Sequence, residues 1–308
     1  MNRKIIVLNI LIFFLCVSCN GQTTSEKEIK HPTLYDGELL LQHVKILSSA
    51  EFEGRQTGTQ GAIKAKQYII KEFSKLDILP LGETYEQPFS FSSRSKMYNG
   101  VNVLGFVKGS AFPEKYIVIS AHYDHEGIKN GNIYNGADDN ASGISALFSF
   151  AEYFKKYPPK HSVILAAFDA EEFGLKGSKY FVDNSIIQLN SIVVNLNLDM
   201  ISRSDKNELF VVGTRYNPSF KELITEIALP ENIKLLIGHD GTDKKHDWTY
   251  SSDHASFYRK EIPFLFFSVE DHEDYHKPTD DYENIQPEFY KEAVNVIFSV
   301  FEKVDILE

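Results

Sequence analysis

Cysteine is scarce in this sequence. Its 308 residues include two, Cys16 and Cys19, and both lie close to the N-terminus. The rest of the chain therefore offers neither a disulfide nor a thiolate ligand for a metal ion. A metal site there would have to use His, Asp and Glu side chains.

An excess of positive charge is also lacking, because 32 Lys and Arg residues stand against 43 Asp and Glu, for a formal net charge of −11. Nucleic-acid phosphates require a positive face, and no cluster of Lys or Arg supplies one. We therefore expect no nucleic-acid partner. Between residues 30 and 308 the sequence has neither a fixed-period repeat nor a Gly/Ser- or Pro-rich linker, which predicts a single domain over 31–308.

The first 18 residues begin with basic side chains and continue with an apolar stretch shorter than the roughly 20 residues that span a bilayer. This pattern predicts a signal peptide. Its end resembles the lipobox of bacterial lipoproteins, although Cys16 stands where that motif usually has Leu, so cleavage without lipidation stays open. We expect a lipid on Cys19, a polar tether over 19–30, and an exported, membrane-anchored protein of the cell envelope.

Short apolar runs that do not alternate with polar residues predict buried central strands. They lie at 116–121, 163–168, 192–198 and 262–268, with a fifth run at 209–212. Apolar residues at three- and four-residue spacing predict helices between them. These begin near residues 59, 141, 218 and 287. The alternation of strands and helices predicts an α/β fold with a mostly parallel, mixed central sheet and helices on both faces.

Residues that commonly bind metal ions follow each of the predicted central strands. His122 follows the first strand, the pair Glu171-Glu172 the second and Asp199 the third, and the fourth is followed by the segment 270–276. Ligands of open α/β sheets bind beyond the carboxyl ends of the strands, so these side chains should meet at one place. Imidazole and carboxylate groups in that arrangement are typical of zinc sites.

Five segments of the sequence match a known family in order. They read SAHYDH, GADDNASG, FDAEEFGLKGS, LNLDM and YHKPTD. With them the chain resembles the co-catalytic di-zinc aminopeptidases of the aminopeptidase S and aminopeptidase Y type, over residues 36 to 300. The resemblance implies a zinc-peptidase-like, phosphorylase/hydrolase-like fold, two zinc ions per chain, and peptide substrates with a free N-terminus.

The same resemblance implies a set of metal ligands. Asp139 would bridge the two zinc ions, His122 and Asp199 would complete one of them, and Glu172 and His276 would complete the other. Composition alone ranks two further histidines equally with His276. These are His125 and His272.

The resemblance also implies catalytic roles for three residues. Glu171 would be the general base that moves a proton from water to the leaving amine. Asp124 would accept the remaining N–H of His122 and so orient that imidazole. Tyr275 would stabilise the oxyanion, and the alternative is a packed aromatic ring. Asp253 lines the substrate pocket or caps a short helix, and Arg55 has no assigned role.

Three other functions stay open from the sequence. The first is a zinc glutaminyl cyclase of the same fold, although that group has a Trp-lined pocket and this chain has only Trp248. The second is a non-catalytic binding lipoprotein, in which loss of ligand residues would be expected. The third is an exopeptidase that acts at the C-terminus, with Arg203 or Arg215 holding the carboxylate.

Overall fold

The computed structural model describes residues 34–307 of the chain. The expected signal peptide, the tether and Cys19 lie outside these residues and stay predictions. Within the described part, none of the helices has the length and apolar character needed to cross a membrane.

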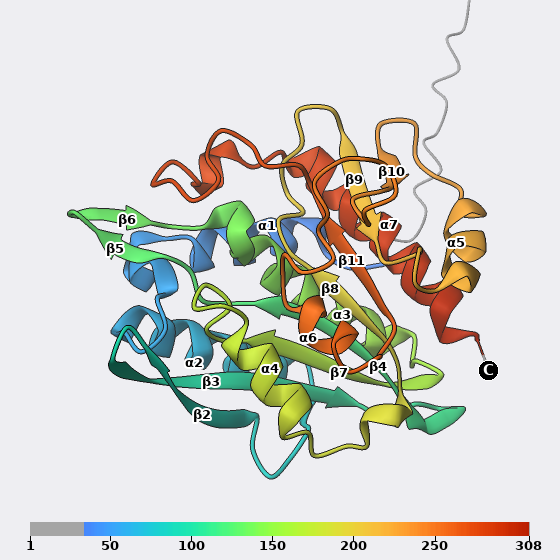
Figure 1. Ribbon diagram of the computed structural model, residues 1–308, viewed down its shortest axis with the longest axis horizontal. Helices are drawn as coiled ribbons and strands as arrows, with labels where there is room; N and C mark the ends of the chain where they lie inside the picture. Colours follow the sequence, from blue (N-terminus) through green and yellow to red (C-terminus); the bar gives the residue numbers. More distant parts are fainter. Residues whose placement is uncertain (1–33, 308) are drawn as a thin grey trace, which may run out of the picture. The chain divides into compact units, whose positions relative to one another are not determined.

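Nine strands of the described residues form one mixed sheet, and two short strands form a separate hairpin (Figure 1). The large sheet contains β1 (Leu79–Pro80), β2 (Glu86–Ser93), β3 (Lys96–Val107), β4 (Phe112–His122), β7 (His161–Phe168), β8 (Ile192–Leu198), β9 (Glu208–Val212), β10 (Lys234–Ile237) and β11 (Phe264–Ser268). The hairpin contains β5 (Gly127–Lys129) and β6 (Asn132–Tyr134). The order in the large sheet is β1-β3-β7-β4-β8-β11-β9-β10, and β2 pairs with β3.

The centre of the large sheet is parallel, and it consists of the four strands predicted from the buried runs. In this centre β7 pairs with β4, β4 with β8 and β8 with β11, all in parallel. The neighbouring strands are antiparallel to this centre, β3 along β7 and β9 along β11. Because the four central strands run the same way, their carboxyl ends lie at one edge, where ligands of such sheets bind.

The described helices include the four that the sequence predicts. They are α1 (Gly37–Leu47), α2 (Gln60–Lys75), α3 (Gly143–Lys156), α4 (Lys176–Asp183), α5 (Pro218–Thr225), α6 (His254–Tyr258) and α7 (Pro287–Asp305), with 3₁₀ helices at Ala50–Arg55, Leu189–Ser191 and Tyr282–Asn284. The hydroxyl of Thr59 caps α2 by accepting from the backbone N–H of Ala62 at 3.3 Å. Pro218 and Pro287 stand in the first turns of α5 and α7, where the missing N–H costs nothing.

Helices cover both faces of the sheet, as the α/β prediction requires. Successive side chains of a strand point to opposite faces. Ile117 and Ile119 of β4 pack in a core with residues of α1, α2, α3 and α7. Val118 packs in a second core with Phe181 of α4 and Phe257 of α6; these two helices lie in front of the sheet in Figure 1. Each large apolar side chain buried in this way contributes about 1.5–3 kcal/mol.

Candidate metal centre

The first group of potential ligands surrounds His122, the last residue of β4. Its Nε2 lies 3.2 Å from Oδ1 of Asp139, in a π-type turn (Ala137–Ser142), and 3.2 Å from Oδ1 of Asp199, which follows β8. All three residues are buried. Two adjacent parallel strands and the turn before α3 therefore bring one imidazole and two carboxylates to a common point.

The second group uses the other oxygen of Asp139. Its Oδ2 lies 3.2 Å from Nε2 of His276, and that same Nε2 lies 3.6 Å from Oε2 of Glu172. The two carboxylate oxygens of Asp139 thus face different imidazoles. A bridging carboxylate between two metal ions requires this arrangement.

The spacing of these donor atoms suits zinc. Zinc binds imidazole nitrogen and carboxylate oxygen at about 2.0–2.2 Å, so tetrahedral ligand atoms stand about 3.3 Å from one another. The four contacts of His122 and His276 with carboxylate oxygens measure 3.2 to 3.6 Å. Imidazole and carboxylate are also the donors that zinc takes in the absence of thiolates. The residues at this edge of the sheet therefore fit zinc, with two groups of potential ligands that share Asp139.

The electrostatics of the side chains at this place favour positive charge. Burial alone would lower the pKa of His122, but the carboxylates of Asp199 and Asp139 outweigh it and raise that pKa well above its ordinary value. Burial would raise the pKa of Asp139, and the neighbouring imidazoles outweigh it and lower that pKa. Protons on the imidazoles supply the charge that a metal ion would otherwise provide.

The structure separates the two histidines that composition could not distinguish from His276. His125 lies in the second group, with Nδ1 2.9 Å from Oε1 of Glu172 and 3.7 Å from Oδ2 of Asp139. His272 lies elsewhere, with Nε2 2.9 Å from Oδ2 of Asp138. The resemblance selected His276 alone, and the position of His125 three residues after His122 was the signal for a further member of this group.

Asp124 contacts His122 through a different atom from the one expected. The Nδ1 of His122 lies 3.0 Å from the backbone carbonyl of Asp124, whereas the carboxylate of Asp124 is 3.8 Å away. That carboxylate instead accepts from the backbone N–H groups of Glu171 at 3.0 Å and Glu172 at 3.3 Å. In this structure the backbone carbonyl of Asp124 is thus the nearer partner of the imidazole, and the expected orienting role of the carboxylate stays a prediction.

A buried arginine holds the loops that carry the site. Arg55, which had no assigned role, donates to the backbone carbonyls of Tyr123 at 2.8 Å and Gly136 at 2.8 Å. Its guanidinium also donates to the carbonyls of Leu47 and Asn135. One side chain thus ties the segment after His122 to the turn that begins before Asp139.

A second carboxylate supports that turn. The two carboxylate oxygens of Asp280 accept from the backbone N–H groups of Asp138 at 2.9 Å and Asp139 at 3.0 Å. Asp138 in turn accepts from the backbone N–H and the hydroxyl of Ser202, both at 2.7 Å. Asp138 therefore has a structural environment outside both ligand groups.

Glu171 and Asp253 bring further carboxyl groups to the site. Burial raises the pKa of the Glu171 carboxyl well above its usual range, and the nearby carboxylates of Asp253, Glu172 and Asp199 act in the same direction. Burial raises the pKa of Asp253 to about 6. Both carboxylate oxygens of Asp253 lack a hydrogen-bond partner among the described residues, and its side chain makes no capping bond to α6. The capping interpretation of Asp253 is therefore not supported.

Tyr275 packs directly on a residue of the second group. Its ring stacks on His276, with ring centroids 3.9 Å apart and planes inclined by 27°. Burial, followed by the charge of Asp139, raises the pKa of its hydroxyl, so the group stays protonated at neutral pH. Stacking explains the position of the ring, and a protonated hydroxyl is compatible with donation to an oxyanion.

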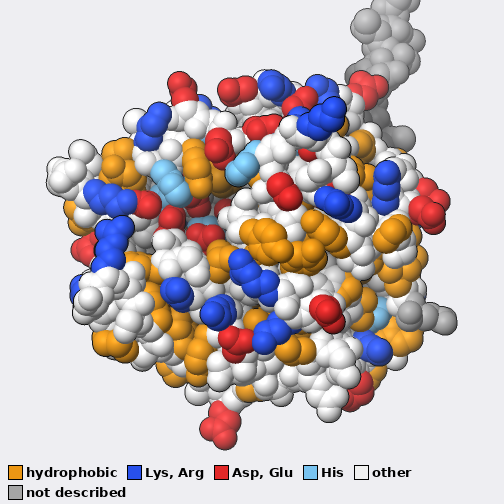
Figure 2. All heavy atoms as spheres, viewed as in Figure 1, with side chains coloured by type: hydrophobic (Ala, Val, Ile, Leu, Met, Phe, Trp, Pro, Cys, Tyr) orange, Lys and Arg blue, Asp and Glu red, His pale blue; other side chains and the backbone are white. Residues whose placement is uncertain are grey.

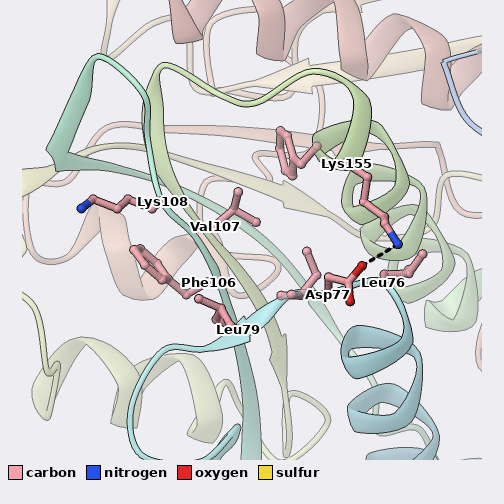
Figure 3. Close-up of a pocket in the computed structure, with 9 residues that line it drawn as sticks. Leu76, Asp77, Leu79, Phe106, Val107, Lys108 and Lys155 are labelled. Atoms are coloured by element: carbon pink, nitrogen blue, oxygen red, sulfur yellow. Dashed lines mark ion pairs between the residues drawn. The ribbon is translucent and has the colours of Figure 1, made fainter.

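Imidazole and acidic side chains gather in a hollow on one face of the molecule (Figure 2). A cavity of about 410 Å³ opens beside the second group. Its lining includes His125, Glu172, Tyr98, Phe173, Arg94 and Lys129. A more apolar pocket of about 340 Å³ lies near β1 and the end of α3, where Lys155 pairs with Asp77 at 2.8 Å (Figure 3). No residue of either ligand group lines that apolar pocket.

A central parallel sheet with imidazole and carboxylate groups at the carboxyl ends of its strands defines an α/β protein suited to binding metal ions. Residues 102–301 match Peptidase family M28. The chain therefore belongs to peptidase family M28.

Individual relatives agree with this assignment. Aminopeptidase YwaD of Bacillus subtilis (strain 168) is 32% identical over 213 residues, which cover 66% of this chain and 44% of the relative. The matched part thus spans less than half of that curated relative. The structure of BSAP, a zinc aminopeptidase from Bacillus subtilis, superposes with a TM-score of 0.70 at 18% identity and covers 88% of this chain and 95% of its own.

A glutaminyl cyclase has the same fold. The enzyme from Porphyromonas gingivalis gives a TM-score of 0.72 at 15% identity, covering 88% of this chain and 99% of its own. At these identities the solved structures establish the fold alone, and they confirm the predicted mixed, mostly parallel α/β architecture.

Proposed function

We propose that this chain is a zinc-dependent aminopeptidase that hydrolyses the N-terminal peptide bond of peptides at a two-zinc centre. The carboxylate of Asp139 carries the proposal, because its two oxygens lie 3.2 Å from Nε2 of His122 and 3.2 Å from Nε2 of His276. Asp199 would complete the first zinc position and Glu172 the second. Membership of peptidase family M28 supports the reaction class.

The protein groups divide the remaining work of hydrolysis. Zinc would supply Lewis-acid chemistry that polarises the peptide carbonyl and activates water. Glu171 takes a proton from the attacking water as the new C–O bond forms, and it then passes that proton to the leaving amine as the C–N bond breaks. A raised pKa suits a carboxyl group that must hold this proton between the two transfers. The Tyr275 hydroxyl is available to donate to the developing oxyanion.

The charge of the site favours the amino end of a substrate over its carboxyl end. Asp253 is a buried carboxylate without a hydrogen-bond partner among the described residues and lies close enough to raise the pKa of Glu171. An acidic group beside Glu171 would favour a cationic α-amine over a substrate carboxylate. The two arginines considered for a substrate carboxylate are already engaged, since Arg203 pairs with Asp274 and Arg215 donates to the carbonyl of Asp240.

The glutaminyl cyclase alternative rests on the shared fold with the Porphyromonas gingivalis enzyme. The position of Trp248 argues against it. This single tryptophan of the chain stacks on His239, with ring centroids 3.5 Å apart, and it packs in a separate core with Phe210 and Phe266. It does not line the cavity beside Glu172.

The deciding experiment uses the chain from residue 20 onward, assayed on aminoacyl anilides with free and blocked N-termini, with and without a chelator. We expect release from free N-termini alone, its loss on chelation, and about two zinc ions per chain by metal analysis. Cyclisation of glutaminyl peptides without anilide release would instead support the glutaminyl cyclase. A chain that binds no zinc would contradict both enzymes and favour a binding lipoprotein.

We also propose that the protein is exported and anchored to a membrane of the cell envelope by a lipid on Cys19. The basic start, the apolar stretch and the lipobox-like end of the leader support this proposal. Metabolic labelling with a fatty acid should mark the wild-type chain and not Cys19→Ser. An unlabelled wild-type chain would contradict the anchor.

A further inference from the structure

We propose that His125 is a fourth protein ligand of the second zinc position, joining Asp139, Glu172 and His276. The first position would then have three protein ligands, His122 and two carboxylates. The proposal rests on the two-zinc centre proposed above, and it adds an asymmetry between the two ions that the ligand set carried over from related aminopeptidases does not contain.

The environment of His125 lacks the partners that a buried imidazole needs. The side chain is 1% exposed, and neither ring nitrogen has a hydrogen-bond partner among the described residues. Oε1 of Glu172 also lacks a partner there. Nδ1 of His125 lies 2.9 Å from this oxygen without hydrogen-bond geometry. Buried polar atoms are nearly always paired, and a cation bound by both atoms would satisfy this pair.

Three donor atoms around this point lie within 4.8 Å of one another: a ring nitrogen of His125 and one oxygen each of Asp139 and Glu172. Nδ1 of His125 lies 2.9 Å and 3.7 Å from oxygens of Glu172 and Asp139. Nε2 of His276 lies 3.6 Å and 3.2 Å from the other oxygen of Glu172 and the same oxygen of Asp139. These values lie on both sides of the roughly 3.3 Å expected between ligands of a tetrahedral zinc ion. Both imidazoles therefore reach the same pair of carboxylates.

The backbone next to the site leaves room for the imidazole of His125. Gly136 has a left-handed conformation with φ of +57°, and a Cβ atom at this residue would stand 2.6 Å and 2.7 Å from two carbons of the His125 ring. A larger residue would therefore clash with this ring and with the backbone oxygen of Asp139. Gly136 is also the residue whose carbonyl Arg55 holds. The turn that presents Asp139 thus also fixes the place of His125.

Four protein ligands make the second position different in kind from the first. Structural zinc sites are closed by four protein ligands, whereas catalytic sites keep a position open for water or substrate. We therefore assign the tighter, more slowly exchanging ion to the second position and the coordination site left open for water or substrate to the first. A limited amount of chelator should remove the first ion and leave the second.

The test measures zinc binding directly by competition with a chromophoric chelator, using the chain from residue 20 onward. In His125→Gln the side-chain amide lies near the place of the imidazole Nε2, so no ligand atom remains at the place of Nδ1. In His125→Asn an amide oxygen lies near the place of Nδ1. We expect His125→Gln to lower the affinity for one of the two zinc ions by at least about tenfold. His125→Asn should lower that affinity by a smaller factor.

A buried histidine away from the site provides the matched control. His43 is 2% exposed and also has one ring nitrogen without a partner among the described residues. His43→Gln should leave both zinc affinities unchanged. Wild-type affinity for both ions in His125→Gln and His125→Asn would overturn the role of His125 and leave the two-zinc proposal intact. A wild-type chain that binds fewer than two zinc ions would overturn both proposals.

Discussion

The carboxylate of Asp124 accepts a hydrogen bond from the backbone N–H of Glu171 at 3.0 Å. The second oxygen accepts from the N–H of Glu172 at 3.3 Å and lies 3.3 Å from the hydroxyl of Thr57, which donates to Asp169 at 2.7 Å. This buried carboxylate therefore determines where the chain turns after β7. This turn places Glu171 for the proposed proton transfer and Glu172 at the second zinc position.

Replacing Asp124 with Asn should impair turnover more than zinc binding. The amide keeps one acceptor oxygen but presents an NH₂ group to a backbone N–H, so the Glu171-Glu172 turn shifts while His122 keeps its bond to the backbone carbonyl. We expect kcat to fall by about 10–100-fold and the first zinc ion to stay bound. Metal analysis and kinetics on one preparation check this. Loss of that zinc ion would instead indicate that the carboxylate orients His122.

Glu171→Gln should retain both zinc ions and lose most of its activity. The amide has nearly the same shape as the carboxyl group, but it cannot accept and return a proton. General acid–base catalysis typically contributes about 10²–10⁴-fold, and kcat should fall by that factor. A variant with full activity and normal zinc content would refute the role of Glu171 as the base.

Two aspartates should differ in the number of zinc ions that their loss releases. Asp139→Ala removes oxygens that face both groups, so both ions should be lost. Asp199→Ala removes an oxygen of the first group alone, and one ion should stay bound. Metal analysis after gel filtration separates the cases. Equal zinc content in the two variants would contradict the bridging position of Asp139.

The sequence predicted the centre of the fold because local patterns determine it. Runs such as 163–168 are apolar throughout, since β7 is covered on both faces, and they read as central strands. The β2–β3 hairpin was not predicted, because β2 is a half-exposed polar strand at an edge. Its tight turn uses two residues with positive φ, Arg94 and Ser95, that carry no glycine signal.

The ligand groups were predictable by residue type and place, but their detailed contacts were not. His122 ends β4 and Asp199 follows the adjacent parallel strand β8, so their meeting follows from the topology. The inclusion of His125 and the direction of the Asp124 carboxylate depend on how loops fold over the strand ends. Those directions are determined by contacts between distant residues, such as Arg55 with Gly136, which leave no local pattern.

Arg55→Lys should destabilise the fold and loosen the metal centre. The guanidinium serves four backbone carbonyls from three segments, and an ammonium group on a different stem cannot reach them all. Each buried carbonyl left without a partner costs about 1–3 kcal/mol. Urea unfolding of the chelator-treated protein should therefore show a loss of several kcal/mol. A loss below about 1 kcal/mol would show that these bonds are dispensable.

The buried His254 should make the stability of the chain depend on pH. Its imidazole stacks on Phe266 with ring centroids 4.2 Å apart, and burial lowers its pKa to about 3. In the unfolded chain the pKa is about 6.5. Below pH 6.5 the unfolded state therefore binds a proton that the folded state does not, and the free energy of unfolding decreases as the pH falls toward 3.

The expected slope from this one group is about 1.4 kcal/mol per pH unit between pH 6 and 4. His43, whose pKa burial lowers to about 4, adds a slope of the same sign. Urea unfolding of the chelator-treated wild type and His254→Asn at several pH values isolates the contribution of His254. The variant should be less stable at pH 7 because it loses the aromatic contact, yet its stability should fall less steeply on acidification. Equal slopes for the two proteins would mean that His254 is protonated in the folded chain, with the backbone carbonyl of Trp248, 2.9 Å from Nε2, as a partner of the imidazolium.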